Sequence, residues 1–217
     1  MDKFLVTPKT RKKLLASLAV ILLVTLHISF LRSLMMNHAA DNVLVIPLVP
    51  IIRSNLTTVL LRFLLAIAQC LMLNEVRRQL AKLGRKAQWA CVLLMAALLI
   101  NAGATIVHYL AWNVLTVDNP WPVVYPFYWM AALGMLIKQV VSIWLAVEFI
   151  LHFAGWLQLT GWLLLGCTLV QVLLSLGVGF ELYGKLGYLL PGLCVLLPYV
   201  ALYAAFTSRK GERVEIV

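Results

Sequence analysis

Six stretches of this 217-residue chain are long and apolar enough to cross a lipid bilayer, and they constrain the fold more than any other feature. A membrane-spanning helix needs about 20 apolar residues to cross a hydrocarbon layer about 30 Å thick. In lipid, only helices and closed barrels satisfy their own backbone polar groups, and uninterrupted apolar runs indicate helices. The sequence therefore predicts an all-α, polytopic integral membrane protein with six transmembrane helices, at about 14–36, 56–73, 87–113, 127–153, 157–177 and 188–207.

The composition agrees with a membrane protein of one domain. Hydrophobic residues make up 63% of the chain and charged residues 12%, whereas a soluble domain carries about 25% charged residues. The length suits a single transmembrane helical domain over residues 1–217. The four cysteines lie in apolar runs without a CxxC pair, which favours buried packing over a metal site or disulfides: Cys70, Cys91, Cys167 and Cys194.

The basic residues predict an orientation. Cytoplasmic segments of membrane proteins carry an excess of Lys and Arg. With six helices, 13 of the 18 basic residues fall on one side, in segments 1–13, 74–86 and 208–217, and three fall on the other side. Both termini are therefore predicted to be cytoplasmic, in a plasma membrane that we expect to be a bacterial inner membrane. The net charge of +10 is explained by this pattern, so we expect no nucleic-acid partner.

Three segments between the predicted helices have a character of their own. Residues 74–86 resemble a short amphipathic helix capped by Asn74, whose basic face either contacts anionic lipid or only sets the topology. The apolar outer run 43–52 contains two prolines, so it is either a packed loop or an edge that binds a partner. The aromatic residues of 116–129 suggest a belt at the headgroup level of the membrane. The more specific alternative is a surface on which an external ligand stacks.

Polar residues inside the predicted spans are the best functional candidates, because ionisable side chains at the bilayer centre are costly and seldom face lipid. At 1.5 Å per residue, several of them fall between the centre and the outer side. They can be drawn as one polar layer that contains no carboxylate. The candidate ligand-binding residues are Arg62, Asn101, Thr105, His108 and Lys138, with His27 and Gln171 as further members of the layer.

Two readings of this layer remain open. In one, Arg62 and Lys138 line a cavity that accepts an anion, a lipid phosphate or a partner's acidic group. In the other, Lys138 is neutral or bonded to Asn101 and to carbonyl groups, and Arg62 extends toward the headgroups. Glu148 lies ten residues from Lys138 and cannot pair with it; Glu148 and His152 are neighbours near the cytoplasmic end, where either could meet a basic residue.

The function that we expect is non-catalytic: an assembly, anchoring or membrane-sensing subunit of a larger membrane complex, with a homo-oligomer or another membrane subunit as partner. The alternative is a small transporter or channel for an anionic or lipid-like substrate, which uses Arg62 and Lys138. No nucleophile and base are placed together, so an enzyme is not expected. No cofactor or metal is expected either, because His27 and His108 differ in depth by roughly 6 Å and suit a haem poorly.

Overall fold

The computed structural model describes residues 7–31, 55–113, 121–175 and 189–207, and every regular element in these ranges is a helix. Six spans are long and apolar enough to cross a membrane, which confirms the predicted all-α class and the six apolar helices. The elements are α1 (Pro8–Thr25), the π-helix η1 (Leu26–Leu31) that continues it, α4 (Asn55–Lys82), α5 (Gln88–Asn113), α6 (Trp121–His152), α7 (Trp156–Ser175) and α9 (Leu189–Thr207).

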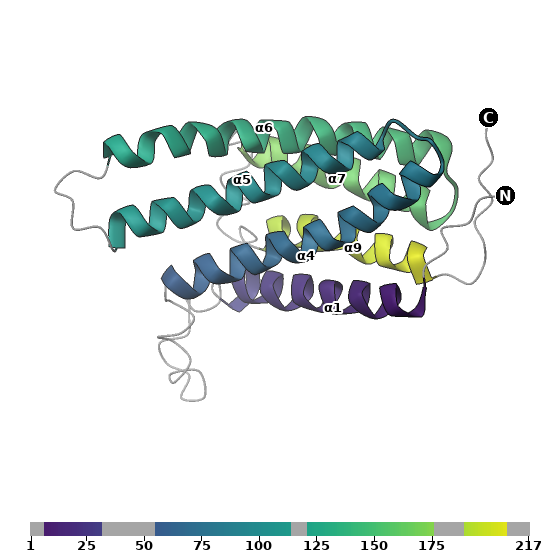
Figure 1. Ribbon diagram of the computed structural model, residues 1–217, viewed down its shortest axis with the longest axis horizontal. Helices are drawn as coiled ribbons and strands as arrows, with labels where there is room; N and C mark the ends of the chain where they lie inside the picture. The colour runs from purple at the N-terminus through teal and green to yellow at the C-terminus, as the bar shows by residue number, and fades with distance from the viewer. Residues whose placement is uncertain (1–6, 32–54, 114–120, 176–188, 208–217) are drawn as a thin grey trace.

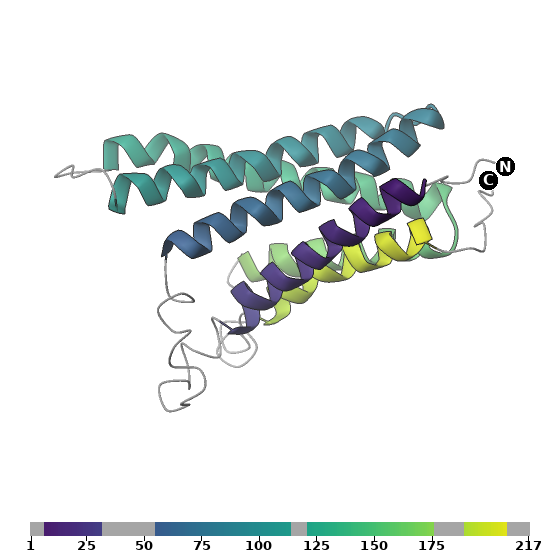
Figure 2. The ribbon, with the colours of Figure 1, turned by 60° about the horizontal axis from the view of Figure 1, so that its bottom comes forward.

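The helices form a closed ring in chain order. Each packs against the helix before it and the helix after it, and α9 returns to pack against α1. Figure 1 shows the long helices running side by side, and Figure 2 shows α4 and α5 on one side of the bundle with α1 and α9 on the other. The ring surrounds a common interior, so polar side chains from helices far apart in sequence can meet there.

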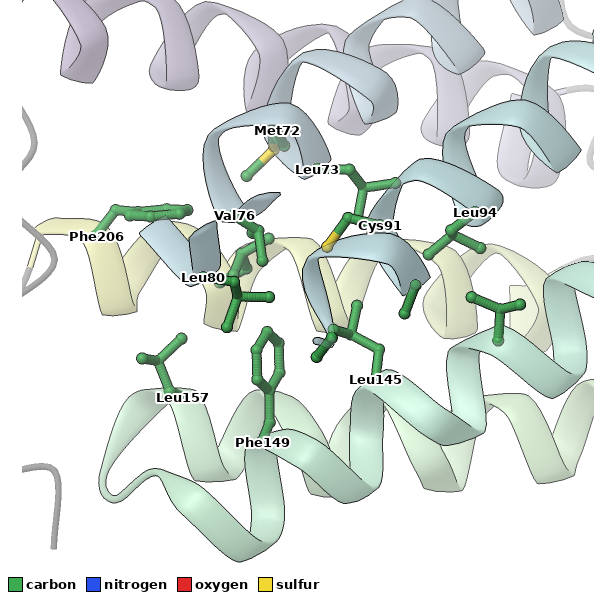
Figure 3. Packing of buried hydrophobic residues seen from close by; sticks show 14 of the residues in the cluster. Met72, Leu73, Val76, Leu80, Cys91, Leu94, Leu145, Phe149, Leu157 and Phe206 are labelled. Carbon is green, nitrogen blue, oxygen red and sulfur yellow. The ribbon is translucent and has the colours of Figure 1, made fainter. Parts of the chain in front are cut away.

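The interior near one end of the bundle is filled by apolar side chains from all six helices. Figure 3 shows Phe149 of α6 pointing toward Val76 and Leu80 of α4, with Leu157 of α7 beside it. Phe149 is almost completely buried, with 1% of its surface exposed. In lipid, such close packing stabilises helix association through van der Waals contact, because burial of apolar surface gives little advantage there.

Two tight turns lie at this end and bring consecutive helices together. Gly84 follows α4 with a φ of 67°, in the left-handed region that favours glycine. The amide of Gly84 donates to the carbonyl of Ala81, and the amide of Arg85 donates to that of Leu80, the pattern of a Schellman helix end. Gly155 takes a φ of 64° between α6 and α7. We call this the basic end, because the described basic residues other than Arg62 and Lys138 lie in or near its turns and in the first turns of α1.

Several predicted helix boundaries were wrong at the ends. The first helix begins at Pro8 because the Thr7 hydroxyl accepts a hydrogen bond from the Thr10 amide and proline suits the first helical position. Residues 74–82 are not a separate helix but the last part of α4, and Asn74 accepts a hydrogen bond from the Arg77 side chain instead of acting as an N-cap. The helix α6 begins at Trp121, whereas the predicted span began at 127. It therefore includes Pro126 and other residues that were predicted as loop.

Helix lengths differ across the ring. At 1.5 Å per residue, α6 with 32 residues is about 48 Å long, while α7 with 20 residues is about 30 Å long, close to the hydrocarbon thickness. Because α6 and α7 share the turn at Gly155, α6 extends past the described part of α7 at the opposite end of the bundle. The predicted outer segment 43–52 and the C-terminal tail lie outside the described residues.

Candidate functional site

The first of two polar sites lies between α4, α5 and α6 at the end opposite the turns. We call it the Arg62 groove; it encloses about 400 Å³. Its polar lining consists of Arg62, Thr105, His108 and Tyr128, and alanines, Val124, Phe127 and Met135 complete it. The rings of His108 and Tyr128 lie edge to face, with centroids 6.5 Å apart. The described lining residues offer a cation and several hydrogen-bonding groups, and none of them carries a carboxylate.

The helical hairpin formed by α4 and α5 explains why these side chains share one level. Arg62 lies 20 residues before Lys82, where α4 ends, and His108 lies 20 residues after Gln88, where α5 begins. Both side chains are therefore about 30 Å from the turn that joins the two helices. A hydrocarbon layer is about that thick, so Arg62 and His108 fall near its far boundary when the turn lies at the near one.

The second site is a small cavity inside the ring, which we call the Lys138 cavity. It has a volume of about 60 Å³ and is lined by side chains of α4, α5, α6, α7 and α9. Among the described residues, Lys138 is the one cationic residue of the lining, and none of the lining residues carries a carboxylate. The neutral polar residues of the lining are Gln69, Gln139, Ser142, Thr160, Thr168, Gln171 and Tyr199.

Some of these polar groups are already satisfied and others are not. The hydroxyls of Thr160 and Thr168 donate to the carbonyls of Trp156 and Leu164 in their own helix, at 2.7 Å each. Gln69 and Ser142 are 5% and 3% exposed, yet within the described residues neither side chain forms a hydrogen bond, and Lys138 forms neither a hydrogen bond nor an ion pair. These three residues therefore present unused donors to the cavity.

Pro198 leaves one backbone carbonyl of α9 without its helical hydrogen bond. It lies inside α9 and lines the cavity together with Cys194. Proline lacks an amide hydrogen, so the carbonyl four residues earlier, that of Cys194, loses its helical partner. The Cys194 thiol lies against the thiol of Cys167 in α7.

The predicted polar layer is divided between the two sites. The cavity lies nearer the basic end than the groove, because Lys138 is three residues, or about 4.5 Å, beyond Met135 of the groove and ten residues, or about 15 Å, beyond Tyr128. Arg62, Thr105 and His108 line the groove, whereas Lys138 and Gln171 line the cavity. The Asn101 carboxamide lines neither; its oxygen lies beside Gly134 of α6, 3.3 Å from where a Cβ would stand.

His27 is also separate from both sites. It lies in η1, and its Nε2 atom is buried without a hydrogen-bond partner in the described structure. Gln69, which lines the Lys138 cavity from α4, was not among the predicted residues of the polar layer. A glutamine within the apolar run 56–73 was the available signal. Within the described ranges, no three histidine, cysteine or acidic residues lie close enough to hold a metal ion.

The charged groups at the basic end form pairs. An Arg85 Nη1 atom lies 3.6 Å from Glu148 Oε1, and His152 Nε2 lies 3.8 Å from the other oxygen of that carboxylate. The predicted meeting of Glu148 with His152 and a basic residue is confirmed. Glu75 is buried, accepts a hydrogen bond from Gln79 and lies 3.5 Å from Arg78. Glu75 and Glu148 are the two acidic residues of the described ranges, so neither cavity contains a carboxylate from them.

No protein family model matches this chain, and no curated protein or solved structure matches it. The function must therefore be argued from the two sites and from the bundle that positions them.

Proposed function

We propose that the protein is a non-catalytic subunit of a membrane complex, and that the Arg62 groove receives an acidic group of its partner. The observation that carries the proposal is the groove itself: about 400 Å³ beside α6, lined by Arg62 and His108 at one level, with no carboxylate among its described lining residues. A guanidinium group binds carboxylates with two parallel hydrogen bonds, which gives both strength and orientation.

The depth of the groove supports this role. An arginine near the boundary of the hydrocarbon layer is in a partly desolvated setting, where a charge pair is worth more than in water. Glu75 and Glu148, the acidic residues of the described ranges, pair with basic residues at the basic end. A carboxylate from a membrane partner, either another subunit or a second copy of this chain, would fit the charge that the groove presents.

The same proposal includes an orientation. The basic end carries the described basic residues of α1 and of the α4–α5 turn, and such residues collect on the cytoplasmic side. We therefore place that end in the cytoplasm and the Arg62 groove at the outer leaflet, in a bacterial inner membrane. A partner would then meet the groove from the periplasmic side or from within the outer leaflet.

Extraction in a mild detergent tests the proposal. We expect the intact protein to elute with a mass larger than one copy in detergent, and Arg62→Leu to reduce that complex at least tenfold. Arg78→Leu is the matched control, because Arg78 is 61% exposed at the basic end. A complex that survives Arg62→Leu, or an intact protein that is monomeric and without a partner, would contradict the proposal. Mass spectrometry of the complex separates a second copy from a different subunit.

One observation favours the alternative, a small transporter or channel: the polar Lys138 cavity inside the ring. Its volume of about 60 Å³ suits only a small solute or a few waters. Transport would therefore require helix movement that joins the cavity to both ends. Flux of a small anion in proteoliposomes, abolished by Lys138→Met and kept by Arg62→Leu, would favour transport over the docking role.

A further inference from the structure

The Lys138 cavity combines three features that together define a binding site. The Lys138 side chain lies among the long apolar helices, none of the described lining residues carries a carboxylate, and two side chains more than nine-tenths buried, Gln69 and Ser142, have no hydrogen-bond partner within the described residues. A buried polar group without a partner costs about 1–3 kcal/mol, and a buried charge costs more. Something that accepts hydrogen bonds would relieve all three groups.

The charge of the missing ligand follows from the lining. Both acidic residues of the described ranges are paired at the basic end, Glu75 with Arg78 and Glu148 with Arg85. The other polar side chains that the described residues bring to the cavity are amides, hydroxyls and thiols, and none of these neutralises a charged Lys138. Water could accept from the ammonium group but would not neutralise it. An anion accepts a hydrogen bond from the ammonium group and also neutralises its charge. It can accept further hydrogen bonds from the Ser142 hydroxyl and the Gln69 amide.

The size of the ligand follows from the volume. A water-sized particle needs roughly 10–15 Å³ of such space, so about 60 Å³ holds roughly four to six such particles, or one small ion with a few waters. A lipid headgroup or an organic acid of the size of gluconate would not fit without movement of the helices. The polar groups of the two sites are separated along the bundle: Arg62 is seven residues, or about 10 Å, from Gln69 on α4, and Tyr128 is ten residues, or about 15 Å, from Lys138 on α6. One small ligand therefore cannot contact the polar groups of both sites.

We infer that the Lys138 cavity binds a single small monovalent anion of the halide class, held by the Lys138 ammonium group with Gln69 and Ser142 as hydrogen-bond donors. The site joins α4 and α6 directly and lies against α5, α7 and α9. Binding therefore stabilises the ring as a whole. This inference does not depend on a partner at the Arg62 groove.

The test is the thermal stability of the purified intact protein in lipid nanodiscs, at constant ionic strength, as sodium gluconate is replaced by sodium bromide or chloride. Gluconate is too large for the cavity. A ligand that binds only the folded state raises the melting temperature with its concentration. We expect a saturable rise of several degrees with halide, no rise in Lys138→Met, and an undiminished rise in Lys86→Met, whose side chain is exposed at the basic end.

Two further variants keep the test decisive if Lys138→Met does not fold. Ser142→Ala and Gln69→Leu each remove one donor without removing the charge, and each should weaken halide binding by about tenfold. A melting temperature that is the same in bromide and gluconate would show that the cavity holds water only. An equal rise in the wild-type protein and in Lys138→Met would place the halide elsewhere, and either result overturns the inference.

Discussion

The Nη1 atom of Arg85, in the turn after α4, lies 3.6 Å from Oε1 of Glu148 near the end of α6. This ion pair links the hairpin of α4 and α5 to α6. The two side chains are 24% and 16% exposed, which limits screening by water. We expect Glu148→Gln and Arg85→Met to be coupled by about 1 kcal/mol in a double-mutant cycle measured by unfolding in mixed detergent. The Arg78–Glu75 pair, where Arg78 is 61% exposed, is the control and should show weaker coupling. Equal coupling in the two pairs would contradict the geometry.

Close approach of α6 and α7 depends on Gly161. A Cβ at this position would stand 2.8 Å from the Ala146 carbonyl oxygen and 3.0 Å from the Cβ of Phe149, so Gly161→Ala forces the helices apart. We expect a loss of about 1–3 kcal/mol in the free energy of unfolding. Gly166, in the same helix, has nothing within 4 Å of its Cβ position. Gly166→Ala should therefore leave the free energy of unfolding unchanged or raise it. A larger loss in Gly166→Ala than in Gly161→Ala would show that α7 packs through another face.

The turn after α4 requires a left-handed residue at Gly84. Its Cβ position has nothing within 4 Å, so a substitution there acts through the backbone and not through a clash. With a φ of 67°, Gly84→Ala should cost about 1 kcal/mol, whereas Gly84→Asn should cost less because asparagine tolerates this region. Thermal unfolding of the two variants measures the difference. Equal stability of both with the wild-type protein would argue against the Schellman turn.

Contact between α7 and α9 can be read out chemically through Cys167 and Cys194. Their thiols lie against each other in the Lys138 cavity, whereas the thiol of Cys70 faces the carbonyl of Met95. We expect a membrane-permeant arsenical, which binds two neighbouring thiols, to protect both Cys167 and Cys194 from a maleimide when Cys70 and Cys91 are replaced by serine. The opposite double variant, which keeps only Cys70 and Cys91, should not be protected. Protection in both chains would mean that the reagent does not report this contact.

Much of the fold could be predicted from the sequence because lipid imposes one simple requirement, an apolar helix of sufficient length. The third span, predicted as 87–113, differs from α5 by a single residue at one end. The starts of α1 and α6 were harder to predict, because proline usually interrupts a helix. Here Pro8 and Pro126 lie in the first turns of their helices, where proline is tolerated. The continuation of α4 past Asn74 was not predicted, because the charged residues of 74–82 follow an apolar run and suggested a separate amphipathic helix.

The candidate site was predictable only in part. Sequence positions gave the depth of Lys138 but not the register between helices, which here comes from the tight turns at Gly84 and Gly155. Arg62 and His108 share a level because their distances from one turn are equal, and Lys138 is about 15 Å nearer the basic end than Tyr128. The packing of α9 against α1 and α7, which closes the ring and brings α9 to the cavity, could not be predicted, because no sequence pattern within α9 indicates which helices it contacts.

The most direct test of the account is the side of the membrane on which each end of the bundle lies. In a chain whose four cysteines are replaced by serine, single cysteines at Lys86 and Asp118 would be exposed to a membrane-impermeant maleimide on intact cells. We expect Asp118→Cys to be labelled at once and Lys86→Cys to be labelled only after the membrane is permeabilised. Labelling of both positions from the same side, or release of the intact chain into solution without detergent, would contradict it.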